Sequence, residues 1–542
     1  MTATASVSSS SSAGINGVLS GTKWGVTSLT YSFPTSPSYY DYSGEKSNNF
    51  GAFNSSQKAA VKNALADFAA ASNLTFNQVT ETGSTEATLR YAFSDSPSAA
   101  WAYYPSTGSW GGDSWYNKSN GYFSNSKMGG WAYSTYLHET GHAVGLSHGH
   151  EGESGFPKMP ASIDSTEFSV MTYHDFVGQN LNTDYGPETW GHPQSLMMYD
   201  IAAIQHMYGA NYDFRSTDTF YRWEPGSGRT FVNGTSQGTP GANRIFLTIW
   251  DGGGEDTYSF TKYSDDLRID LRPGKWTTTN SEQTALIGTE DDGTQHYARG
   301  NIANALLYKG NKDSLIENAY GGSGDDTIQG NAAENELKGN GGDDRLFGFG
   351  DSDTLAGAGG DDFLKAGGGD DRVFGGKHDD TLLGQAGNDR MNGGAGADRL
   401  FGGGGNDHMS GGSGQDLLNA KAGADTLFGG KHDDTLFGGS GNDSLNGGNG
   451  VDRLVGGSGN DTLVGGAGAD DFVYGGKAGS DEIQGFEPNV DDIDLSAYKS
   501  LDHISDLTIR NDHGDTVIEF FNTTIVLDGV SKSALDNDDF IF

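Results

Sequence analysis

A nine-residue pattern repeats without interruption from Gly321 to Val473, and it constrains the fold of this chain more than any other feature. The pattern is G-G-x-G-x-D-x-U-x, where U is a large apolar residue, and it occurs seventeen times. Glycine turns the chain easily, and one apolar side chain per nine residues can fill only a thin core. We therefore expect a parallel β-roll in which the glycine segment turns and the last three residues of each repeat form a short strand.

The sixth position of the repeat is Asp in every copy except one, where Asn335 replaces it. In a roll, equivalent carboxylates stack at about the interstrand spacing, near 5 Å. Each like-charge contact costs roughly 1 kcal/mol in water and several near a protein surface. We therefore predict that Ca²⁺ binds between the turns and that the array is disordered without it. The predicted calcium ligands in the array are Asp326, Asp344, Asp353, Asp362, Asp371, Asp380, Asp389, Asp398, Asp407, Asp416, Asp425, Asp434, Asp443, Asp452, Asp461 and Asp470.

A second motif, H-E-x-x-H-x-x-G-x-x-H, begins at His138. His138 and His142 are four residues apart, so on a helix both rings leave from one face and one Zn²⁺ can accept both at about 2 Å. Gly145 tolerates a left-handed conformation, so it can end the helix and bring His148 round as a third ligand. Three neutral ligands leave a fourth position for water, whose pKa zinc lowers to about 7. Glu139 can then act as general base.

Further motifs connect these two signals. The run S-V-M-T-Y, from Ser169 to Tyr173, fits the Met-turn that accompanies this zinc signature. With "GGDSWYN" from Gly111, "LMMYDIAAIQHMYGAN" from Leu196 and the repeats, it makes the chain resemble the serralysins, which are secreted bacterial metzincins with an RTX calcium-binding repeat domain. The resemblance runs over nearly the whole chain. It implies an α+β metzincin-like catalytic domain followed by an all-β parallel β-roll.

The resemblance also implies roles for single residues. Met171 would underlie the zinc site, and Tyr173 would be an additional zinc ligand that swings away to hydrogen-bond the tetrahedral intermediate. The alternative for Tyr173 is a buried structural tyrosine. One calcium would be held by Arg215, Thr217, Thr219, Asp251, Gly253 and Asp256, and another by Gly254, Asp256, Leu315 and Glu317. Thr217 and Leu315 depart from the family's usual Gly and Thr, and the alternative for each of these residues is a solvated turn.

Five segments are expected along the chain. They are a propeptide or disordered tail at 1–14, a catalytic domain at 15–212, a connecting segment with calcium loops at 213–320, the nonapeptide roll at 321–473, and a β cap with a secretion signal at 474–542. A helix is predicted over 54–71, and strands over 89–93, 516–521 and 524–527. The apolar run 99–104 precedes a glycine-rich stretch, and in the family a sheet edge near here pairs with the substrate backbone.

Composition excludes several classes of protein. The formal net charge of −39 argues against a nucleic-acid partner, because phosphate binding needs a basic surface. There are no cysteines, so disulfides cannot stabilise the fold. No apolar run reaches the length of a membrane-spanning helix, and the first dozen residues do not form a conventional signal peptide. The chain ends Asp539-Phe540-Ile541-Phe542, which resembles the uncleaved type I secretion signal of the family.

These patterns favour a secreted, monomeric zinc endopeptidase that uses one Zn²⁺ and several Ca²⁺ per chain. Its partners would be protein substrates and the type I secretion machinery. A second interpretation is a calcium-dependent surface or adhesion module with an inactive protease-like domain, against which the intact zinc motif speaks. A third, an RTX lipase, rests on G-x-S-x-G at Gly234–Gly238, whose surroundings read as a loop rather than the strand and helix that this motif needs.

Overall fold

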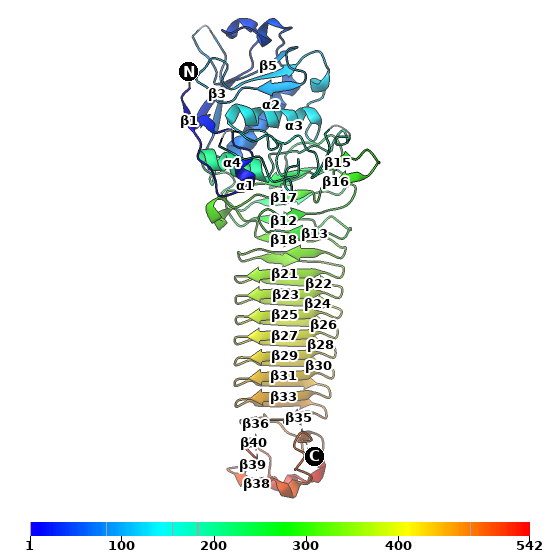
Figure 1. Ribbon diagram of the computed structural model, residues 1–542. Helices are drawn as coiled ribbons and strands as arrows, with labels where there is room; N and C mark the ends of the chain where they lie inside the picture. The colour runs from blue at the N-terminus through cyan, green and yellow to red at the C-terminus, as the bar shows by residue number, and fades with distance from the viewer. Residues whose placement is uncertain (1, 83, 154, 182–183, 477) are drawn as a thin grey trace. The chain divides into compact units, whose positions relative to one another are not determined.

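The computed structural model describes residues 2–82, 84–153, 155–181, 184–476 and 478–542 (Figure 1). The chain forms two compact units. The first runs to Lys262 and includes Asp270–Ile316, and the second comprises Tyr263–Ile269 and Glu317–Phe542. This division is coarser than the five segments expected from the sequence, whose boundaries stay predictions.

The first unit contains a five-stranded sheet in the order β4-β3-β5-β7-β6. Its strands are β3 (Ser28–Ser32), β4 (Thr75–Gln78), β5 (Leu89–Ser94), β6 (Ala100–Ala102) and β7 (Asp113–Asn117). β5 confirms the strand predicted over 89–93, and all six of its residues are buried. β6 lies within the run 99–104 at the edge of the sheet and is antiparallel to β7, whereas the other neighbouring strands run parallel.

Three longer helices pack in the same unit: α2 (Ser55–Ala71), α3 (Trp131–Val144) and α4 (Met198–Tyr208). α2 confirms the predicted helix. The Asn54 side chain accepts from the backbone N–H of Gln57, whose side chain accepts in return from the Asn54 N–H. Residues of all three helices share one apolar core with the sheet, so α3 is fixed on several sides.

The N-terminal segment corrects one expectation. Residues up to about 13 were expected to form a disordered tail or a propeptide, but Thr4–Ser6 forms strand β1, which pairs antiparallel with β2 (Thr22–Trp24). Ser12 then caps a short helix, α1 (Ala13–Asn16). Backbone pairing orders a sequence that is poor in large apolar residues, so the disordered tail is wrong within the described residues. The propeptide stays a proposal, and Met1 lies outside those residues.

Short strands make up the rest of the first unit. They are β8 (Phe220–Trp223), β9 (Thr230–Val232), β10 (Thr235–Ser236), β11 (Leu247–Ile249), β12 (Thr257–Ser259), β14 (Trp276–Thr277), β15 (Leu286–Thr289), β16 (Gln295–Tyr297) and β17 (Ile302–Asn304). The G-x-S-x-G run lies in the β9–β10 hairpin, and the exposed Ser236 hydroxyl donates to the carbonyl of Gly238 at 3.1 Å. This hairpin is not the strand–helix elbow of a serine hydrolase.

The second unit is dominated by a parallel β-roll (Figure 1). Each strand pairs with the strand 18 residues further on, so two repeats make one turn, as in the register of Leu346 with Leu364. The apolar residue of every repeat is at most 2 % exposed. The regular strands are β21 (Arg345–Gly350), β22 (Thr354–Gly359), β23 (Phe363–Gly368), β24 (Arg372–Lys377), β25 (Thr381–Ala386), β26 (Arg390–Ala395), β27 (Arg399–Gly404), β28 (His408–Ser413), β29 (Leu417–Ala422), β30 (Thr426–Lys431), β31 (Thr435–Ser440), β32 (Ser444–Asn449), β33 (Arg453–Ser458) and β34 (Thr462–Ala467).

The strands of the roll are longer than the sequence predicted. From β21 to β34 they span six residues instead of three, because pairing continues through the first three positions of the next repeat. Those positions include residues with positive φ, such as Gly367 at 128° and Gly376 at 130°, whose missing side chains allow the neighbouring backbone to approach.

A β cap follows the roll. Its strands are β36 (Ser480–Gln484), β37 (Asp492–Asp494), β38 (Thr508–Asp512), β39 (Asp515–Phe520), β40 (Thr523–Leu527) and β41 (Phe540–Ile541). β39 and β40 confirm the two strands predicted there. No helix among the described residues is both long and apolar enough to cross a membrane.

Candidate metal centre

Helix α3 and the turn after it bring three histidines together. His138 and His142 leave the helix one turn apart, and Gly145 ends it with a φ of 112°. A Cβ at Gly145 would lie 2.4 Å from the carbonyl oxygen of Thr22, so both the conformation and the packing require glycine here. The chain therefore turns back and presents His148.

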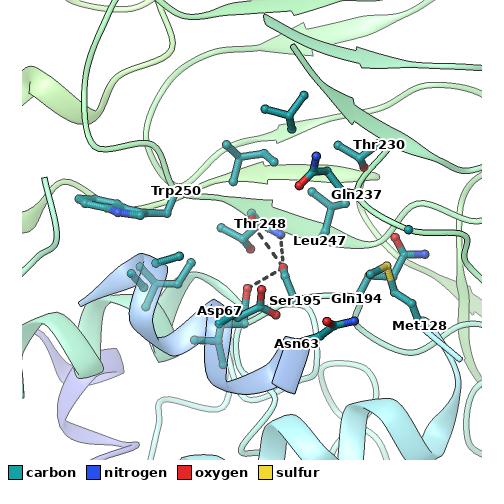
Figure 2. Close-up of a pocket in the computed structure, with 18 of the residues that line it drawn as sticks. Asn63, Asp67, Met128, Gln194, Ser195, Thr230, Gln237, Leu247, Thr248 and Trp250 are labelled. Atoms are coloured by element: carbon teal, nitrogen blue, oxygen red, sulfur yellow. Dashed lines mark hydrogen bonds between the residues drawn. The ribbon is translucent and has the colours of Figure 1, made fainter. Parts of the chain in front are cut away.

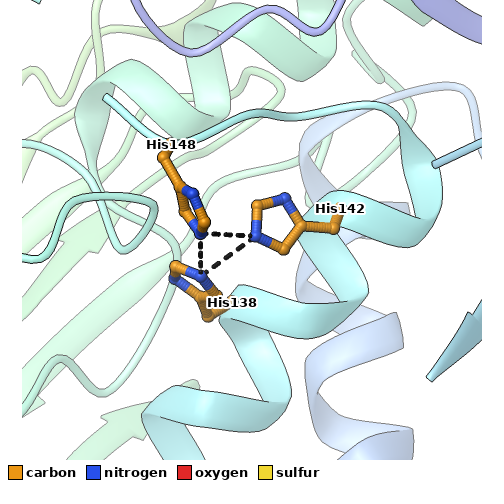
Figure 3. A group of neighbouring side chains, drawn as sticks. All are labelled: His138, His142 and His148. Carbon is orange, nitrogen blue, oxygen red and sulfur yellow. Dashed lines mark hydrogen bonds between the residues drawn. The ribbon is translucent and has the colours of Figure 1, made fainter. Parts of the chain in front are cut away.

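The three Nε2 atoms face one another (Figure 3). They are 3.1 Å apart between His138 and His142, 2.9 Å between His142 and His148, and 3.2 Å between His148 and His138. Three nitrogens bound to one tetrahedral Zn²⁺ at about 2.0–2.1 Å would be about 3.3 Å apart. The donor set and its spacing fit a single zinc ion.

The Nδ1 atoms of His138 and His142 are hydrogen-bonded to backbone carbonyls on the side away from the other rings. Nδ1 of His138 donates to the carbonyl of Val170 at 2.7 Å, and Nδ1 of His142 donates to that of Leu146 at 2.8 Å. Since carbonyls only accept, both rings carry their proton on Nδ1 and present an Nε2 lone pair inward. Burial lowers the pKa of His138 to about 3 and that of His142 well below its ordinary value, which keeps both rings neutral.

The third ring has a carboxylate partner that sequence reasoning missed. Nδ1 of His148 lies 2.8 Å from Oε2 of Glu151, which is about half exposed. The signal was available, because an acid three residues after a ligand histidine in a turn can reach its ring. Such a partner orients the ring and makes the lone pair on its other nitrogen, Nε2, a stronger ligand for a metal ion.

Glu139 lies beside the histidines with an unused oxygen. Its side chain is 5 % exposed, and Oε2 has no hydrogen-bond partner among the described residues. Burial raises the pKa of Glu139 to about 8. Glu139, His138 and Tyr173 line one cleft of about 530 Å³. A carboxylate with high proton affinity therefore faces a space that can hold a substrate.

The segment from Ser169 to Met171 supports the three histidines by packing against helix α3. Met171 is fully buried, and a Cβ at Gly141 would lie 2.5 Å from its sulfur, so Met171 packs directly under α3. Asp200 of α4 accepts from the Ser169 hydroxyl at 2.5 Å and from the N–H of Val170 at 2.8 Å. Asp200 lies inside the run LMMYDIAAIQHMYGAN, but the sequence did not predict its contacts with Ser169 and Val170.

Tyr173 is neither buried nor distant. Its side chain is 50 % exposed, and its ring centroid lies 5.8 Å from that of His138 and 4.5 Å from that of His148. Burial of the hydroxyl and the nearby Glu139 raise the pKa of Tyr173 to about 12. The phenol therefore stays protonated at neutral pH and can donate a hydrogen bond. Its exposure disagrees with the alternative of a buried structural tyrosine.

The loops predicted to hold calcium in the first unit converge in part. Asp251 is 1 % exposed and accepts from the Tyr221 hydroxyl at 2.6 Å, while Asp256 is fully buried and accepts from the N–H of Thr219 at 2.7 Å. A Cβ at Gly254 would lie 2.5 Å from the backbone of Thr217, so the two loops touch.

The remaining predicted ligands of these loops are placed as follows. Arg215 has a φ of 51° and donates from its guanidinium to the Tyr221 hydroxyl, at 2.8 Å. A Cβ at Gly253 would approach the carbonyl of Asp313 to 3.1 Å, and the nearby Leu315 is buried. Glu317 belongs to the second unit, where its carbonyl accepts from the side chain of Asn335 at 2.8 Å.

The aspartates of the roll form a regular ladder. Oδ1 of Asp371, for example, accepts from the N–H of Asp353 at 2.7 Å, and the same contact recurs along both sides of the roll. Among the described residues, the second carboxylate oxygens of these aspartates have no hydrogen-bond partner from Asp344 to Asp470. A Cβ at Gly348 would lie 2.2 Å from Oδ2 of Asp353, so each free oxygen sits against a glycine turn. Burial and adjacent carboxylates raise the pKa of Asp380 to about 8. These orphaned oxygens fit divalent cations.

Two family models match parts of the chain that follow the histidine site. A family model described as the RTX calcium-binding nonapeptide repeat matches residues 320–355, 347–382, 375–409, 410–445 and 446–478. A second, Peptidase M10 serralysin C terminal, matches residues 210–282. Over residues 210–282 the chain is therefore similar to the serralysins.

Curated relatives are matched over part of their length. Metallopeptidase AprA of Pseudomonas marginalis is 32% identical over 323 residues, which cover 58% of this chain and 62% of that protein. Metalloprotease AprA of Pseudomonas entomophila (strain L48) is 34% identical, over 58% of this chain and 61% of its own length. Serralysin G of Dickeya chrysanthemi is 31% identical, over 57% and 60%. The chain therefore spans about three fifths of these serralysin relatives.

Proposed function

We propose that this chain is a secreted zinc- and calcium-dependent endopeptidase that hydrolyses peptide bonds of extracellular proteins with broad specificity. The observation that carries the proposal is the convergence of three imidazole nitrogens next to a buried carboxylate, Glu139, that has no hydrogen-bond partner among the described residues for one oxygen and lines a cleft with His138. The names of the serralysin and AprA relatives support the reaction class. Broad specificity and a role of the C-terminal residues in type I secretion are parts of the same proposal.

The chain's own residues would divide the work. His138, His142 and His148 would hold the zinc ion, which when bound would supply Lewis acidity to the peptide carbonyl and to water. Glu139 would take a proton from the attacking water and pass it to the leaving amine. The high proton affinity that burial gives Glu139 suits this transfer, and a cation nearby would lower its pKa from about 8 toward neutrality.

Two further elements would position the substrate. The Tyr173 hydroxyl would donate a hydrogen bond to the negative charge that develops on the carbonyl oxygen of the scissile peptide bond. β6 is an edge strand and has a neighbouring strand, β7, on one side only. Backbone N–H and C=O groups on its other side could therefore pair with an extended peptide. Pairing through the main chain is indifferent to side chains, which suits broad specificity.

Calcium would be held by the ladder aspartates and by the loops at 215–219 and 251–256, together with Leu315 and Glu317. The number of ions stays open. The role of the ladder ions would be structural, since the ladder lies in a unit separate from the cleft. In calcium-poor conditions the unpaired carboxylates would keep the roll unfolded, which suits export of an unfolded chain.

A chelator-controlled assay tests the proposal. The purified protein in millimolar calcium should contain one zinc per chain and hydrolyse casein, and a zinc-selective chelator should abolish the activity until zinc is returned. Glu139→Gln should keep the zinc and the fold but lose at least about 10³-fold in rate. Glu86→Gln makes the same charge change on a side chain that is 63 % exposed, and it should leave the rate unchanged. A zinc-free protein, or an unchanged rate in the Glu139 variant, would remove the proposal and favour the adhesion module.

A further inference from the structure

A second cavity lies in the first unit, away from the zinc cleft. Its volume is about 270 Å³, and helix α2, the segment before α4 and strands β9 and β11 contribute to its wall. Figure 2 shows α2, which carries Asn63 and Asp67, facing strand β11 with Leu247 and Thr248. None of the lining residues is a predicted zinc ligand, and of the predicted calcium ligands only Arg215 lines it. The proposed protease activity does not use this space.

Most of the wall is apolar. Leu196, Ile201, Leu247, Ile249 and Trp250 contribute side chains to it. A volume slightly below that of ordinary small-molecule sites, with a largely hydrophobic wall, fits a ligand smaller than a typical drug.

Several polar side chains on the wall already have hydrogen-bond partners in the protein. The Ser195 hydroxyl accepts from the Thr248 N–H at 2.9 Å, and the Gln194 amide donates to the carbonyl of Arg244 at 2.8 Å. The Gln237 amide donates to the carbonyl of Thr235 at 2.9 Å and accepts from Arg215 at 3.3 Å. These side chains are therefore committed to the protein and set the shape of the cavity.

Asp67 is different. Its Oδ2 is shielded from solvent, and among the described residues of this wall it is the one such side-chain atom without a hydrogen-bond partner. Burial raises the pKa of Asp67 to about 7, although the positive charge of Arg215 acts in the opposite direction. The Asp67 side chain as a whole is partly exposed, but a shielded oxygen without a partner is destabilising, so a ligand that supplies a charged donor would relieve that cost.

We propose that this cavity is a binding site for a protonated primary amine on a short apolar body, with Asp67 as its counter-ion. The ammonium group would donate to Oδ2, and the alkyl part would lie against Leu247, Ile249 and Trp250. A neutral alcohol of the same length would fill the space without the charge, and a quaternary amine would bring the charge without a donor. The same ammonium chemistry is carried by free alkylamines and by the N-terminus of a short peptide with an apolar first residue.

Isothermal titration calorimetry on the full chain in millimolar calcium tests the site. The probes are n-hexylammonium, n-hexanol and tetramethylammonium, with leucine amide for the peptide N-terminus. We expect n-hexylammonium or leucine amide to bind with a Kd of about 1 mM or tighter, and at least about tenfold more tightly than hexanol or tetramethylammonium. The tighter of the two identifies the source of the amine, and either supports the site.

Two variants separate this site from other binding. Asp67→Asn keeps the shape and removes the charge, so it should weaken amine binding at least about tenfold. Ala70→Leu leaves Asp67 in place and fills the cavity, so it should abolish binding, with circular dichroism confirming the fold. An amine that bound at the zinc centre instead would keep its affinity in both variants, and that outcome would overturn the proposal. So would equal binding of hexanol and hexylammonium. Neither result bears on the protease proposal.

Discussion

The roll without calcium should fold in acid and unfold at neutral pH. The pKa is raised to about 8 for Asp344, Asp353, Asp380 and Asp434, and to about 7 for Asp371 and Asp407. The physical causes are burial first, with neighbouring carboxylates adding to it. Since these values lie above the unfolded value of about 3.9, the folded state holds protons more tightly than the unfolded state. The stability they contribute is complete below about pH 4 and is lost progressively as the pH rises from there through the folded values of about 7 and 8.

The magnitude is large enough to decide the outcome. One pKa unit corresponds to about 1.4 kcal/mol, so each of these six carboxyls destabilises the fold by about 3 kcal/mol between pH 5 and pH 7.5. Together they amount to about 18 kcal/mol, and halving this for solvent screening leaves about 9 kcal/mol. That is comparable with the whole free energy of unfolding of a domain, which is 5–15 kcal/mol. Calcium bound to the same oxygens would remove the penalty.

Hydrogen exchange read by peptide mass is the suitable assay. All nine tryptophans precede residue 277, so intrinsic tryptophan fluorescence does not report on the roll. We expect the repeats to be protected at pH 5 without calcium, unprotected at pH 7.5 without calcium, and protected again at pH 7.5 with millimolar calcium. Peptides of the sheet β3–β7 provide an internal control and should stay protected throughout.

A single substitution sharpens this test. Asn335 already occupies the sixth position of one repeat, and its side-chain oxygen accepts from the Asn331 N–H at 2.7 Å without a charge. Asp380→Asn should therefore stabilise the calcium-free roll by about 1.5 kcal/mol at pH 7.5, the screened value for one carboxyl, and weaken calcium binding. Calcium-free repeats that remain protected at pH 7.5, with no effect of this substitution, would refute the electrostatic reasoning.

Three other predictions concern the zinc centre. Tyr173→Phe should lower kcat about 10²-fold with little change in KM, because the hydroxyl would act mainly on the developing oxyanion. Steady-state kinetics on a peptide substrate checks this prediction. A change in KM alone would contradict it. Gly141→Ala should destabilise the first unit by about 1–3 kcal/mol in urea unfolding, because its Cβ would lie 2.5 Å from the Met171 sulfur. Asp200→Ala should cost about 3 kcal/mol and reduce bound zinc on elemental analysis, since the N–H groups of Val170 and Met197 would lose their acceptor, while full zinc occupancy would argue against this support.

The sequence predicted those features that depend on local spacing. The nine-residue period predicted the parallel β-roll and the burial of the eighth residue of each repeat. The spacing of His138, His142 and His148 was sufficient to expect one shared metal ion. The apolar stripe of Val61, Leu65 and Phe68 was sufficient to expect helix α2. Each of these follows from residues within one or two turns of each other.

What could not be predicted depends on contacts between distant segments. Strand β1 forms because Thr4–Ser6 meets β2, and no local apolar pattern announces such pairing. The six-residue strands of the roll arise because glycine backbones approach their neighbours 18 residues away. Asp200 reaches Val170 across 30 residues, and Asp67 faces a strand 180 residues further on. Such partners become visible only when the chain is folded.

The aspartate ladder has a direction. At the sixth position of the repeat, the backbone N–H donates to a carboxylate of the turn that follows it in sequence, as Asp353 does with Asp371. At the exposed fifth position the contact runs the other way, as in the N–H of Asp361, which donates to Asp343 of the preceding turn. At the far end the cap supplies the missing acceptors, because Asp481 and Asp491 receive the N–H groups of Asp461 and Asp470 at 3.0 and 3.1 Å. For the sixth-position ladder, the cap is thus the template on which the last turn closes, and every earlier turn closes on its successor. A chain that emerged from a pore with this end first would present its template before the copies, and winding would proceed backward along the sequence as each turn became available.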